Sequence, residues 1–528
     1  MLNRKPIAVS LLLVAVSAVT SAQFSKYGVR FRSQIPLNQM PNSPSSGAGC
    51  TGYVSSSGRE YAIMGVRNGT VIVDVTNTLA PTILTRIPSQ ASTWHENVTY
   101  GSYGYFVTDQ VGNGMQIVDL SQVDSGVATL VSTYSAGGLS TVHTIQVNPV
   151  SKTLYLNGTN GGLVMLDVTN PVAPVEVGRW EGPGSKYVHD SIPISYTTGP
   201  YAGKEILYAM CGSNGIYVLD VTNKANPVVL GFNKYLPSGT YCHSGLITPD
   251  RRYLLVNDEF DESQGMVSNA STHIFDIQGP NTVTYLGKFV NPIDAIDHNS
   301  RYKDGFMLLA AYRAGIRVYD IVTPTAPRET GFFDSYPGSG FSYDGAWGTF
   351  IFPSGTAIIS DINGGLFVVD PSEAMDLGAP YLSHALAKGA VIGGNLDDMR
   401  KDDGAYYSLE GFSSLNSRRS GILDAFVLET TKLPATRLDI TFNGRISLIP
   451  NAYLRVMLKS VSSGQWVQVG SWTLGQTETT LSVTNVPSGD YISANGRIEM
   501  QIDSLPTGKT ASGKFNLLVD MLKVSVHN

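Results

Sequence analysis

The sequence is poor in cysteine and in charge. Only three of its 528 residues are cysteines, and charged residues make up 15% of the chain. Three cysteines cannot build the disulfide framework of a small secreted scaffold. With 36 basic and 42 acidic residues the formal charge is −6, and no basic stripe is present, so we expect no nucleic-acid partner.

Beyond its N-terminus the chain also lacks an apolar run long enough to span a bilayer. The N-terminus itself has the order of a secretory signal: Arg4 and Lys5, the apolar residues 7–19, and small residues that end at Ala22. We therefore predict a signal peptide over residues 1–22, with an uncleaved anchor as the alternative. The mature protein is expected to be secreted, extracellular or periplasmic, without a transmembrane segment.

Sequence signatures of familiar enzymes are missing as well. There is no nucleophile elbow, HExxH motif or phosphate-binding loop. Ser140 and Thr141 precede His143 but stand in no recognisable triad context. Whether the chain is an enzyme stays open at this point.

What the chain does have is a repeat. A strand-like run that ends in aspartate occurs seven times: GTVIVD, GMQIVD, GLVMLD, GIYVLD, STHIFD, GIRVYD and GLFVVD. The aspartates are Asp74, Asp119, Asp167, Asp220, Asp276, Asp320 and Asp370. Their spacing of 44 to 56 residues is close to the period of propeller blades. A short carboxylate at this place can accept a backbone N–H of the following turn, so we interpret the aspartates as structural.

Each copy contains four strand-like runs separated by Asn, Gly and Pro turns, and the chain has 55 Gly and 27 Pro. These features predict an all-β fold with a seven-bladed β-propeller over residues 24–380. The last copy lacks a good fourth strand, whereas residues 27–37 resemble the fourth strand of the first copy. We expect this N-terminal segment to complete blade seven. The repeat alignment also favours a Cys211–Cys242 bridge, which leaves Cys50 free.

Five of the eight histidines occupy one column at the start of the innermost strand of successive blades. They are His95, His143, His189, His243 and His298, with Cys50 and Trp347 in the corresponding places of blades one and seven. Since one end of each innermost strand meets the central channel, these side chains should rim one mouth of that channel. Imidazoles and carboxylates that converge there suit a divalent metal or acid–base chemistry. The alternative is a structural hydrogen-bond network, because five histidines exceed the ligands of one ion.

The candidate sites follow from this placement. Ligand-binding candidates in the predicted funnel are His95, His143, His189, His243, His298, Asp109, Asp190, Asp297, Arg313 and Asp361. Metal-ligand candidates are His143, His189, His243, Asp258, Glu259 and His298, for Zn²⁺, Ca²⁺ or Mg²⁺. The loop NDEFDESQGMVSN carries Asp258, Glu259, Asp261 and Glu262, and is either a flexible site for a hard cation or a solvated acidic loop.

Several long motifs resemble the choice-of-anchor B family of secreted bacterial proteins built from LVIVD repeats. They include GREYAIMGVRNG, YCHSGLITPDRRYLLVNDEFDE, GFFDSYPG and GAWGTFIFPSG, and the likeness extends from about residue 24 to residue 371. The resemblance implies export and a propeller fold but no biochemical activity. No anchor of that family is recognisable here, which favours release of the protein, or its retention by a partner, over attachment to the surface.

Residues 390–528 abandon the repeat and alternate short strands with Ser-Gly and Asn-Gly turns. This pattern predicts a C-terminal, jelly-roll-like β-sandwich, a type of module that often binds carbohydrate or a surface. Trp466 and Trp472 are candidates for stacking on sugar rings, or else they pack inside the sandwich.

Three functions remain open. The leading one is a binding or interaction module whose His/Asp funnel holds a divalent metal or a small ligand; carbohydrate or a surface protein are the other partners considered. The second is a metal-dependent hydrolase or lyase that uses the same funnel. The third is a purely structural surface protein, since the fold alone cannot decide among them.

Overall fold

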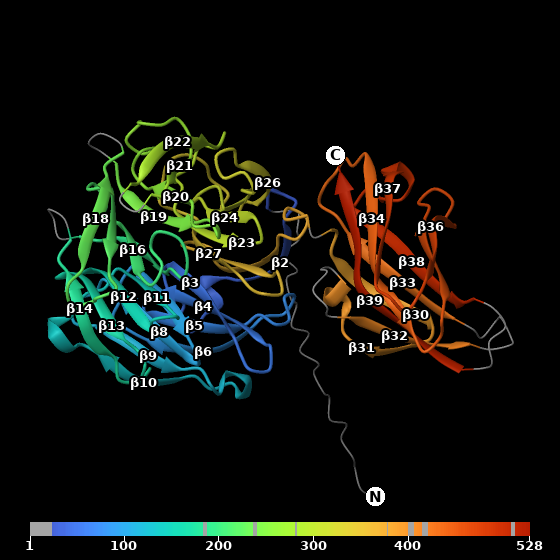
Figure 1. Cartoon of the computed structure of the whole chain (residues 1–528), viewed down its shortest axis with the longest axis horizontal. Coiled ribbons are helices and arrows are strands. Elements are labelled where there is room, and N and C mark those ends of the chain that lie inside the picture. Colours follow the sequence, from blue (N-terminus) through green and yellow to red (C-terminus); the bar gives the residue numbers. More distant parts are fainter. Residues whose placement is uncertain are drawn as a thin grey trace, which may run out of the picture.

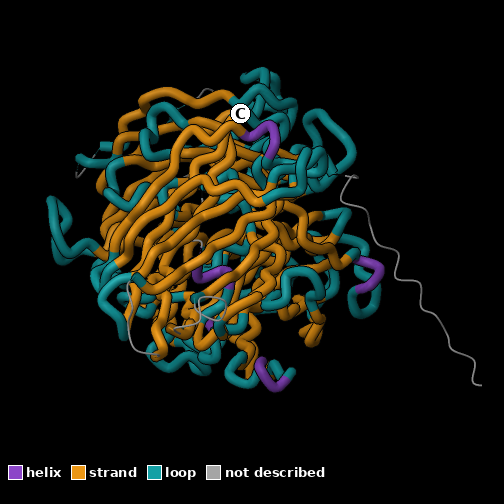
Figure 2. The backbone as a smooth tube through the Cα atoms, turned by 90° about the vertical axis from the view of Figure 1, so that its right-hand side faces the viewer, coloured by secondary structure: helices purple, strands orange, loops and turns teal. Residues whose placement is uncertain are grey.

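The structure, a computed structural model, describes residues 24–182, 187–235, 240–279, 282–376, 378–399, 406–413, 421–507 and 513–527. The predicted signal peptide lies outside these residues. The described chain is all-β, and its strands form two groups of antiparallel sheets that lie side by side (Figure 1). Strands dominate the trace, with only short helical turns between them (Figure 2). Those turns are η2 (Leu37–Gln39), η3 (Val123–Ser125), η4 (Ala136–Gly138), η5 (Leu396–Met399) and η6 (Ser488–Asp490).

The first group contains seven sheets, and each is built around one copy of the sequence repeat. The first two sheets are β3 (Gly47–Val54), β4 (Glu60–Val66), β5 (Gly69–Asp74), β6 (Thr82–Pro88), and β7 (His95–Tyr100), β8 (Tyr103–Thr108), β9 (Met115–Asp119), β10 (Thr129–Tyr134). The next two are β11 (Thr144–Asn148), β12 (Thr153–Thr159), β13 (Gly162–Asp167), β14 (Val175–Trp180), and β15 (Asp190–Ser195), β16 (Glu205–Met210), β17 (Ile216–Asp220), β18 (Val228–Asn233). The fifth is β19 (Cys242–Ile247), β20 (Tyr253–Asp258), β21 (Ser271–Asp276), β22 (Thr284–Val290).

The last two sheets each contain a strand from the N-terminal segment. The sixth contains β23 (Asn299–Lys303), β24 (Phe306–Ala310), β25 (Ile316–Asp320), β26 (Arg328–Phe333) and, at its edge, β1 (Lys26–Tyr27). The seventh contains β27 (Ala346–Ile351), β28 (Ala357–Asp361), β29 (Gly365–Asp370) and β2 (Arg30–Ile35). In that sheet β2 pairs antiparallel with β29 as the outermost strand. The first and last parts of the repeat region are thereby joined.

The first strands of the seven sheets contact one another in cyclic order. β3 contacts β7, and the contacts continue through β11, β15, β19 and β23 to β27, which contacts β3 again. The third strands lie between neighbouring sheets and are buried on both faces, as in β5 and β29, where every residue is buried. This explains their nearly continuous runs of Val, Ile and Leu. Outer strands such as β22 alternate exposed and half-buried residues because one face meets solvent.

The structural role of the repeated aspartates is confirmed. In all seven copies the aspartate Oδ1 accepts a hydrogen bond from the backbone N–H two residues later, at 2.6 to 3.0 Å. This is an Asx-turn, and in the first six copies it starts the link to the outer strand of the same sheet. The turn that follows each third strand therefore explains why aspartate recurs at this position in every copy.

The second group comprises two five-stranded sheets with one shared core. One sheet has the order β30 (Tyr381–Lys388), β33 (Ile422–Glu429), β38 (Arg497–Pro506), β35 (Ala452–Lys459), β36 (Trp466–Leu474). The other has the order β31 (Ala390–Gly393), β32 (Tyr407–Ser413), β39 (Gly513–His527), β34 (Arg437–Ser447), β37 (Thr479–Pro487). In chain order, the first strand of this second group is β30, which starts at Tyr381, nine residues before the sequence-based limit of 390. Trp472 packs partly buried against the core, and Lys459 lies over the ring of Trp466.

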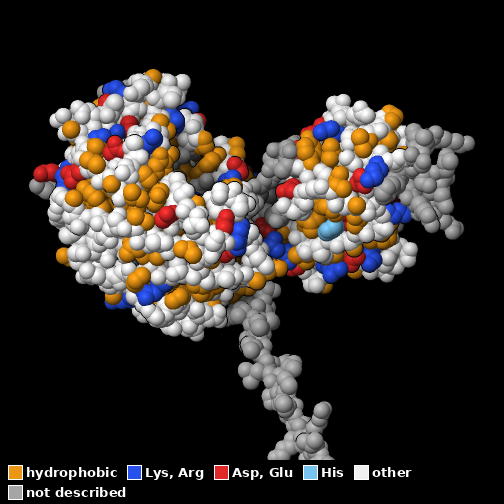
Figure 3. All heavy atoms as spheres, turned by 90° about the horizontal axis from the view of Figure 1, so that it is seen from below, with side chains coloured by type: hydrophobic (Ala, Val, Ile, Leu, Met, Phe, Trp, Pro, Cys, Tyr) orange, Lys and Arg blue, Asp and Glu red, His pale blue; other side chains and the backbone are white. Residues whose placement is uncertain are grey.

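Polar contacts join the two groups of sheets. Arg30 of β2 pairs with Glu429 at 2.6 Å, and Glu373 accepts hydrogen bonds from the backbone and hydroxyl of Thr431. Seen from below, basic and acidic side chains intermingle over both groups (Figure 3). In the part of the chain that the structure describes, no helix is long and apolar enough to cross a bilayer.

The prediction of a Cys211–Cys242 disulfide is wrong. Both residues, like Cys50, are buried free thiols. Gly212 and Cys242 form a backbone bridge, so the segment after β16 and the start of β19 meet there through main-chain hydrogen bonds instead. Burial raises the pKa of the Cys50 thiol to about 11, which keeps that sulfur protonated and unreactive at neutral pH.

Candidate functional site

Four of the five column histidines form a continuous layer at one end of the inner strands. His143, His189 and His298 each stand one residue before an inner strand, and His243 is the second residue of β19. Neighbouring imidazole centroids are 4.4, 4.0 and 4.2 Å apart along the order 143, 189, 243, 298. The layer arises because equivalent positions of successive repeats meet around the ring of inner strands.

Hydrogen bonds to the next repeat fix the orientation of these rings. The Nδ1 of His189 lies 2.8 Å from the carbonyl oxygen of His243, and the Nδ1 of His298 lies 2.5 Å from that of Trp347. Because a carbonyl only accepts, both Nδ1 atoms carry the proton. Each neutral ring then presents the lone pair of its Nε2.

This tautomer makes His143 a cation. Its Nε2 lies 2.8 Å from the Nε2 of His189, which is the acceptor, so His143 must donate there. Its Nδ1 lies 2.9 Å from a carboxylate oxygen of Asp109 and donates as well. Burial alone would lower the pKa of His143, but the hydrogen bond and charge of Asp109 outweigh it, and the pKa is raised. An imidazolium–carboxylate pair thus borders the layer.

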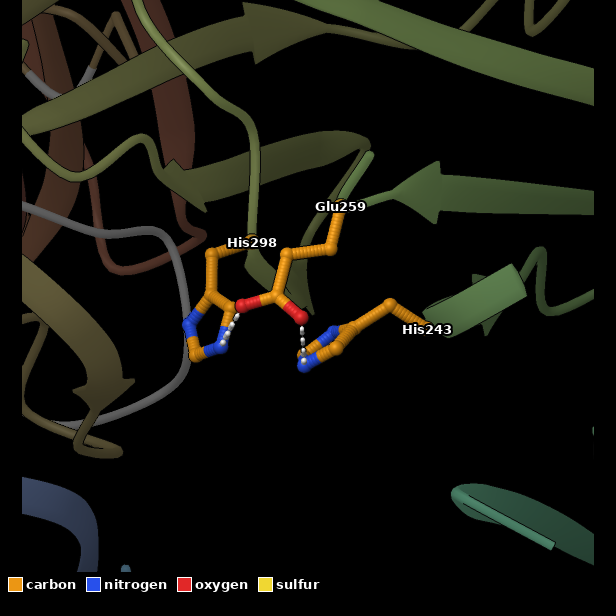
Figure 4. Close-up of side chains that lie close together, drawn as sticks. All are labelled: His243, Glu259 and His298. Carbon is orange, nitrogen blue, oxygen red and sulfur yellow. Dashed lines mark ion pairs between the residues drawn. The ribbon is translucent and has the colours of Figure 1, made fainter. Parts of the chain in front are cut away.

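At the other end of the layer, Glu259 from the loop after β20 lies between two imidazoles (Figure 4). Its Oε1 is 3.6 Å from the Nε2 of His298, and its Oε2 is 3.8 Å from the Nε2 of His243. Both distances exceed a hydrogen bond. The ligand atoms of these three residues all lie within 4.8 Å of one another. Tyr312 donates a hydrogen bond of 2.7 Å to Glu259 and holds the carboxylate in place.

Burial keeps these imidazoles neutral. It lowers the pKa of His298 to about 3 and that of His243 well below its ordinary value, with neighbouring histidines adding to the effect on His243. Burial also raises the pKa of Glu259, although the bond from Tyr312 opposes this. Neutral nitrogen donors that face a carboxylate across a gap of this size suit a cation, since two bonds of ~2.1 Å span it.

The histidine layer separates two cavities. The inner one, of about 170 Å³, lies along the inner strands and is lined by polar groups that include Glu96, Asp190 and Arg301. The outer one, of about 620 Å³, is a cup with aromatic walls. The side chains of His143, His189, His243, His298 and Trp347 border both cavities. A ligand in the cup would therefore rest on the histidine layer.

Not all predicted funnel residues reach this cup. Asp109, Glu259 and four histidines line it, whereas Asp190 faces the inner cavity. His95 lines neither cavity, and its Nε2 is hydrogen-bonded to Ser89 at 2.7 Å. Burial lowers the pKa of His95 to about 4, which is typical of a neutral core histidine.

Three further candidates are held elsewhere in the fold. Arg313 forms an ion pair with Asp344 at 2.7 Å. Asp361 is fully buried and accepts hydrogen bonds from Ser335 and from the backbone of the turn that follows. Asp297 is fully buried beside Asn257, whose amide donates to it at 2.6 Å. None of the three borders either of the two cavities described above.

Three of the four acidic side chains in the loop after β20 are buried, so the expectation of a solvated acidic loop is wrong for them. Asp258, Asp261 and Glu262 are at most 1% exposed. Asp258 accepts backbone hydrogen bonds that shape the loop, and Asp261 pairs with His273 at 2.9 Å. Of the four acidic residues in this loop, Glu259 is the one that turns toward the histidine layer.

The aromatic walls of the cup were not anticipated. They are formed by Trp94, Tyr187, Tyr241, Phe260, Tyr312, Tyr343 and Trp347. Tyr187 and Tyr241 each stand two residues before a column histidine, and Trp94 stands one residue before His95. The sequence therefore shows an aromatic residue one or two positions before several column histidines, and this signal could have predicted aromatic side chains beside the histidine layer.

The His143–Asp109 pair gives a pH-dependent prediction. Because the folded-state pKa of His143 is raised above 6.5, its stabilisation is complete below about pH 6.5 and is lost as the pH rises through that pKa. We expect Asp109→Asn to lower the unfolding free energy at pH 6 by about 1.5 kcal/mol, since Asp109 is partly exposed. The deficit should shrink toward pH 9, as measured by urea denaturation at both pH values.

Asp119→Asn is the matched control, because an amide oxygen can still accept the turn hydrogen bond of Asp119. A deficit in Asp109→Asn that is the same at pH 6 and pH 9 would contradict a charged His143.

Comparison with models of known protein families identifies a repeat in the chain. The family model of the LVIVD repeat matches residues 154–181, which span β12, β13 and β14. No curated protein matches the chain. The match covers part of one sheet, so it identifies an LVIVD repeat within this all-β chain.

Proposed function

We propose that this chain is an exported, seven-bladed β-propeller of the choice-of-anchor B type that binds a divalent metal ion on its histidine layer. The propeller would cover residues 24–380, with β2 closing the seventh blade, and a jelly-roll-like sandwich would follow over residues 390–528. The cyclic contacts of the inner strands and the pairing of β2 with β29 support this architecture. The metal would serve a binding function in the outer cup.

One observation carries the metal proposal. The lone pair of His298 Nε2 faces the Glu259 carboxylate across 3.6 Å, too far for a hydrogen bond and a natural span for one bound ion. His243 supplies a third donor, and its Nδ1 has no hydrogen bond within ordinary limits. Two imidazoles and one carboxylate favour Zn²⁺ or a similar transition metal over Ca²⁺ and Mg²⁺, which prefer oxygen ligands.

The test is metal analysis of the mature protein purified without chelator. We expect close to one transition-metal ion per chain, and a loss of zinc affinity of ~100-fold or more in His298→Ala. His95→Ala is the matched control, because His95 belongs to the same column but lines neither cavity. Circular dichroism would verify that both variants fold. A metal-free wild type, or zinc affinity unchanged in His298→Ala, would leave the histidine layer with a structural role.

A further inference from the structure

The outer cup combines aromatic walls with a charged floor, which is formed by the histidine layer together with Asp109 and Glu259. Among the residues that the structure describes, its lining holds seven aromatic side chains, four histidines and two carboxylates, and no lysine or arginine. Its volume of about 620 Å³ is in the range of pockets for small organic ligands. Such a lining favours a ligand with a flat body and one polar end.

The charges at the floor indicate the sign of that polar end. Asp109 and the His143 imidazolium compensate each other at 2.9 Å. If the proposed ion is present, its two positive charges are met by the single negative charge of Glu259. The floor then carries a net charge of +1, and a site with three protein ligands keeps a coordination position open for a further group.

His243 and His298 border both cavities, but Glu259 borders the cup and not the inner cavity, so the open position would face the cup. An anionic oxygen group in that position would neutralise the floor and complete the metal coordination. In contrast, a neutral hydroxyl would leave one positive charge uncompensated in a buried site.

The walls indicate what the anionic group is attached to. Tyr241 and Phe260 stack on each other with ring centroids 4.6 Å apart, so each ring holds the other in place in the wall of the cup. Trp94 and Tyr343 are both 44% exposed at the rim, so their faces are accessible to a ligand. Aromatic faces pack against flat apolar surfaces such as an aromatic ring or one face of a sugar.

From these features we infer that the cup binds a ring-shaped monocarboxylate, with the carboxylate on the metal and the ring against the aromatic wall. The inference rests on the proposed metal site and names the ligand class of that site. The ring can come from a sugar acid or from an aromatic acid, which share this chemistry.

Calorimetric titration of the zinc-loaded mature chain tests this inference with matched pairs of probes. Benzoate is compared with benzyl alcohol, and glucuronate with glucose. We expect at least one acid to bind ~10-fold or more tightly than its neutral partner, and the preference to disappear when zinc is removed. Trp94→Ala should weaken that acid several-fold without changing the zinc content, whereas Trp472→Ala, in the second group of sheets, should have no effect.

The outcomes separate the two proposals. Zinc bound at one ion per chain, with neither acid preferred over its neutral partner, would overturn the ligand class and leave the metal site standing. A chain that binds no zinc would overturn both.

Discussion

Deletion of residues 24–37 from the mature chain should abolish the cooperative folding of the seven-sheet ring. These residues contain β1 and β2, and β2 is the outermost strand of the seventh sheet. Without it, the backbone of β29 would lose its partner and the sheet would gain an open edge. The effect should be large because the segment contributes to the core as well as to the sheet.

The size of the effect follows from what the segment buries. Val29, Ile35 and Leu37 are each at most 9% exposed. Phe24 and Phe31 pack against Phe333, with ring centroids 5.3 and 5.9 Å away. At roughly 1.5–3 kcal/mol for each fully buried apolar side chain, these five contribute about 5–10 kcal/mol once partial exposure is allowed for. That is comparable with the whole stability of a typical domain.

The truncated chain is best compared with the full mature chain by thermal unfolding and limited proteolysis. We expect the cooperative thermal transition of the seven-sheet group to be lost and this group to be cleaved rapidly. A synthetic peptide of residues 24–40 added in trans should restore protection, because it can pair with β29, whereas a scrambled peptide should not. Ser33→Ala is a mild control that removes only the hydrogen bond to the Thr78 carbonyl. An unchanged melting temperature after truncation would show that β2 does not close the ring.

The repeat made much of this fold accessible from the sequence. The aspartate that ends each third strand caps a turn, so its chemistry is local and recurs in every copy. The histidine column was equally visible, because equivalent positions of a repeat occupy equivalent places around a ring. The four histidines of the layer lie where that argument puts them.

What the repeat could not provide is the direction of side chains in connections of unequal length. Glu259, Asp261 and Glu262 share one loop, yet one carboxylate turns to the histidine layer and two turn into the core. Asp297 is adjacent to His298 in sequence but points away from the cup, as alternation along a strand-like segment requires. The free thiols of Cys211 and Cys242 likewise depend on backbone geometry that sequence spacing does not report.

The buried pair of His273 and Asp261 leads to the second large effect. Both side chains are completely inaccessible and lie 2.9 Å apart. They are surrounded by further carboxyls: burial and the charge of Asp297 raise the pKa of Glu262, and the charge of Asp261 raises it as well. Removal of His273 would leave Asp261 buried without its basic partner, in a region already crowded with acids. Breaking a buried pair in this way typically costs ~3–5 kcal/mol.

We therefore expect His273→Ala to lower the unfolding free energy by about 3–5 kcal/mol in urea denaturation at neutral pH. The double variant His273→Phe/Asp261→Asn should recover much of this loss, because it replaces the pair by neutral groups of similar size. His384→Ala is the matched control: His384 pairs with the buried Asp424 at 3.1 Å but is itself 32% exposed, so its removal lets water reach the carboxylate. Equal losses in the two single variants would contradict the argument from burial.

The same variant connects the core to the cup. Asp261 stands two residues after Glu259 in one loop, and its carboxylate is anchored by His273. If His273→Ala releases that anchor, Glu259 should lose its fixed place between His243 and His298, and zinc affinity should fall together with stability. In the double variant the loop keeps a neutral anchor, so zinc affinity should return along with the unfolding free energy. A variant that loses stability but binds zinc as tightly as the wild type would show that Tyr312 alone holds Glu259 in position.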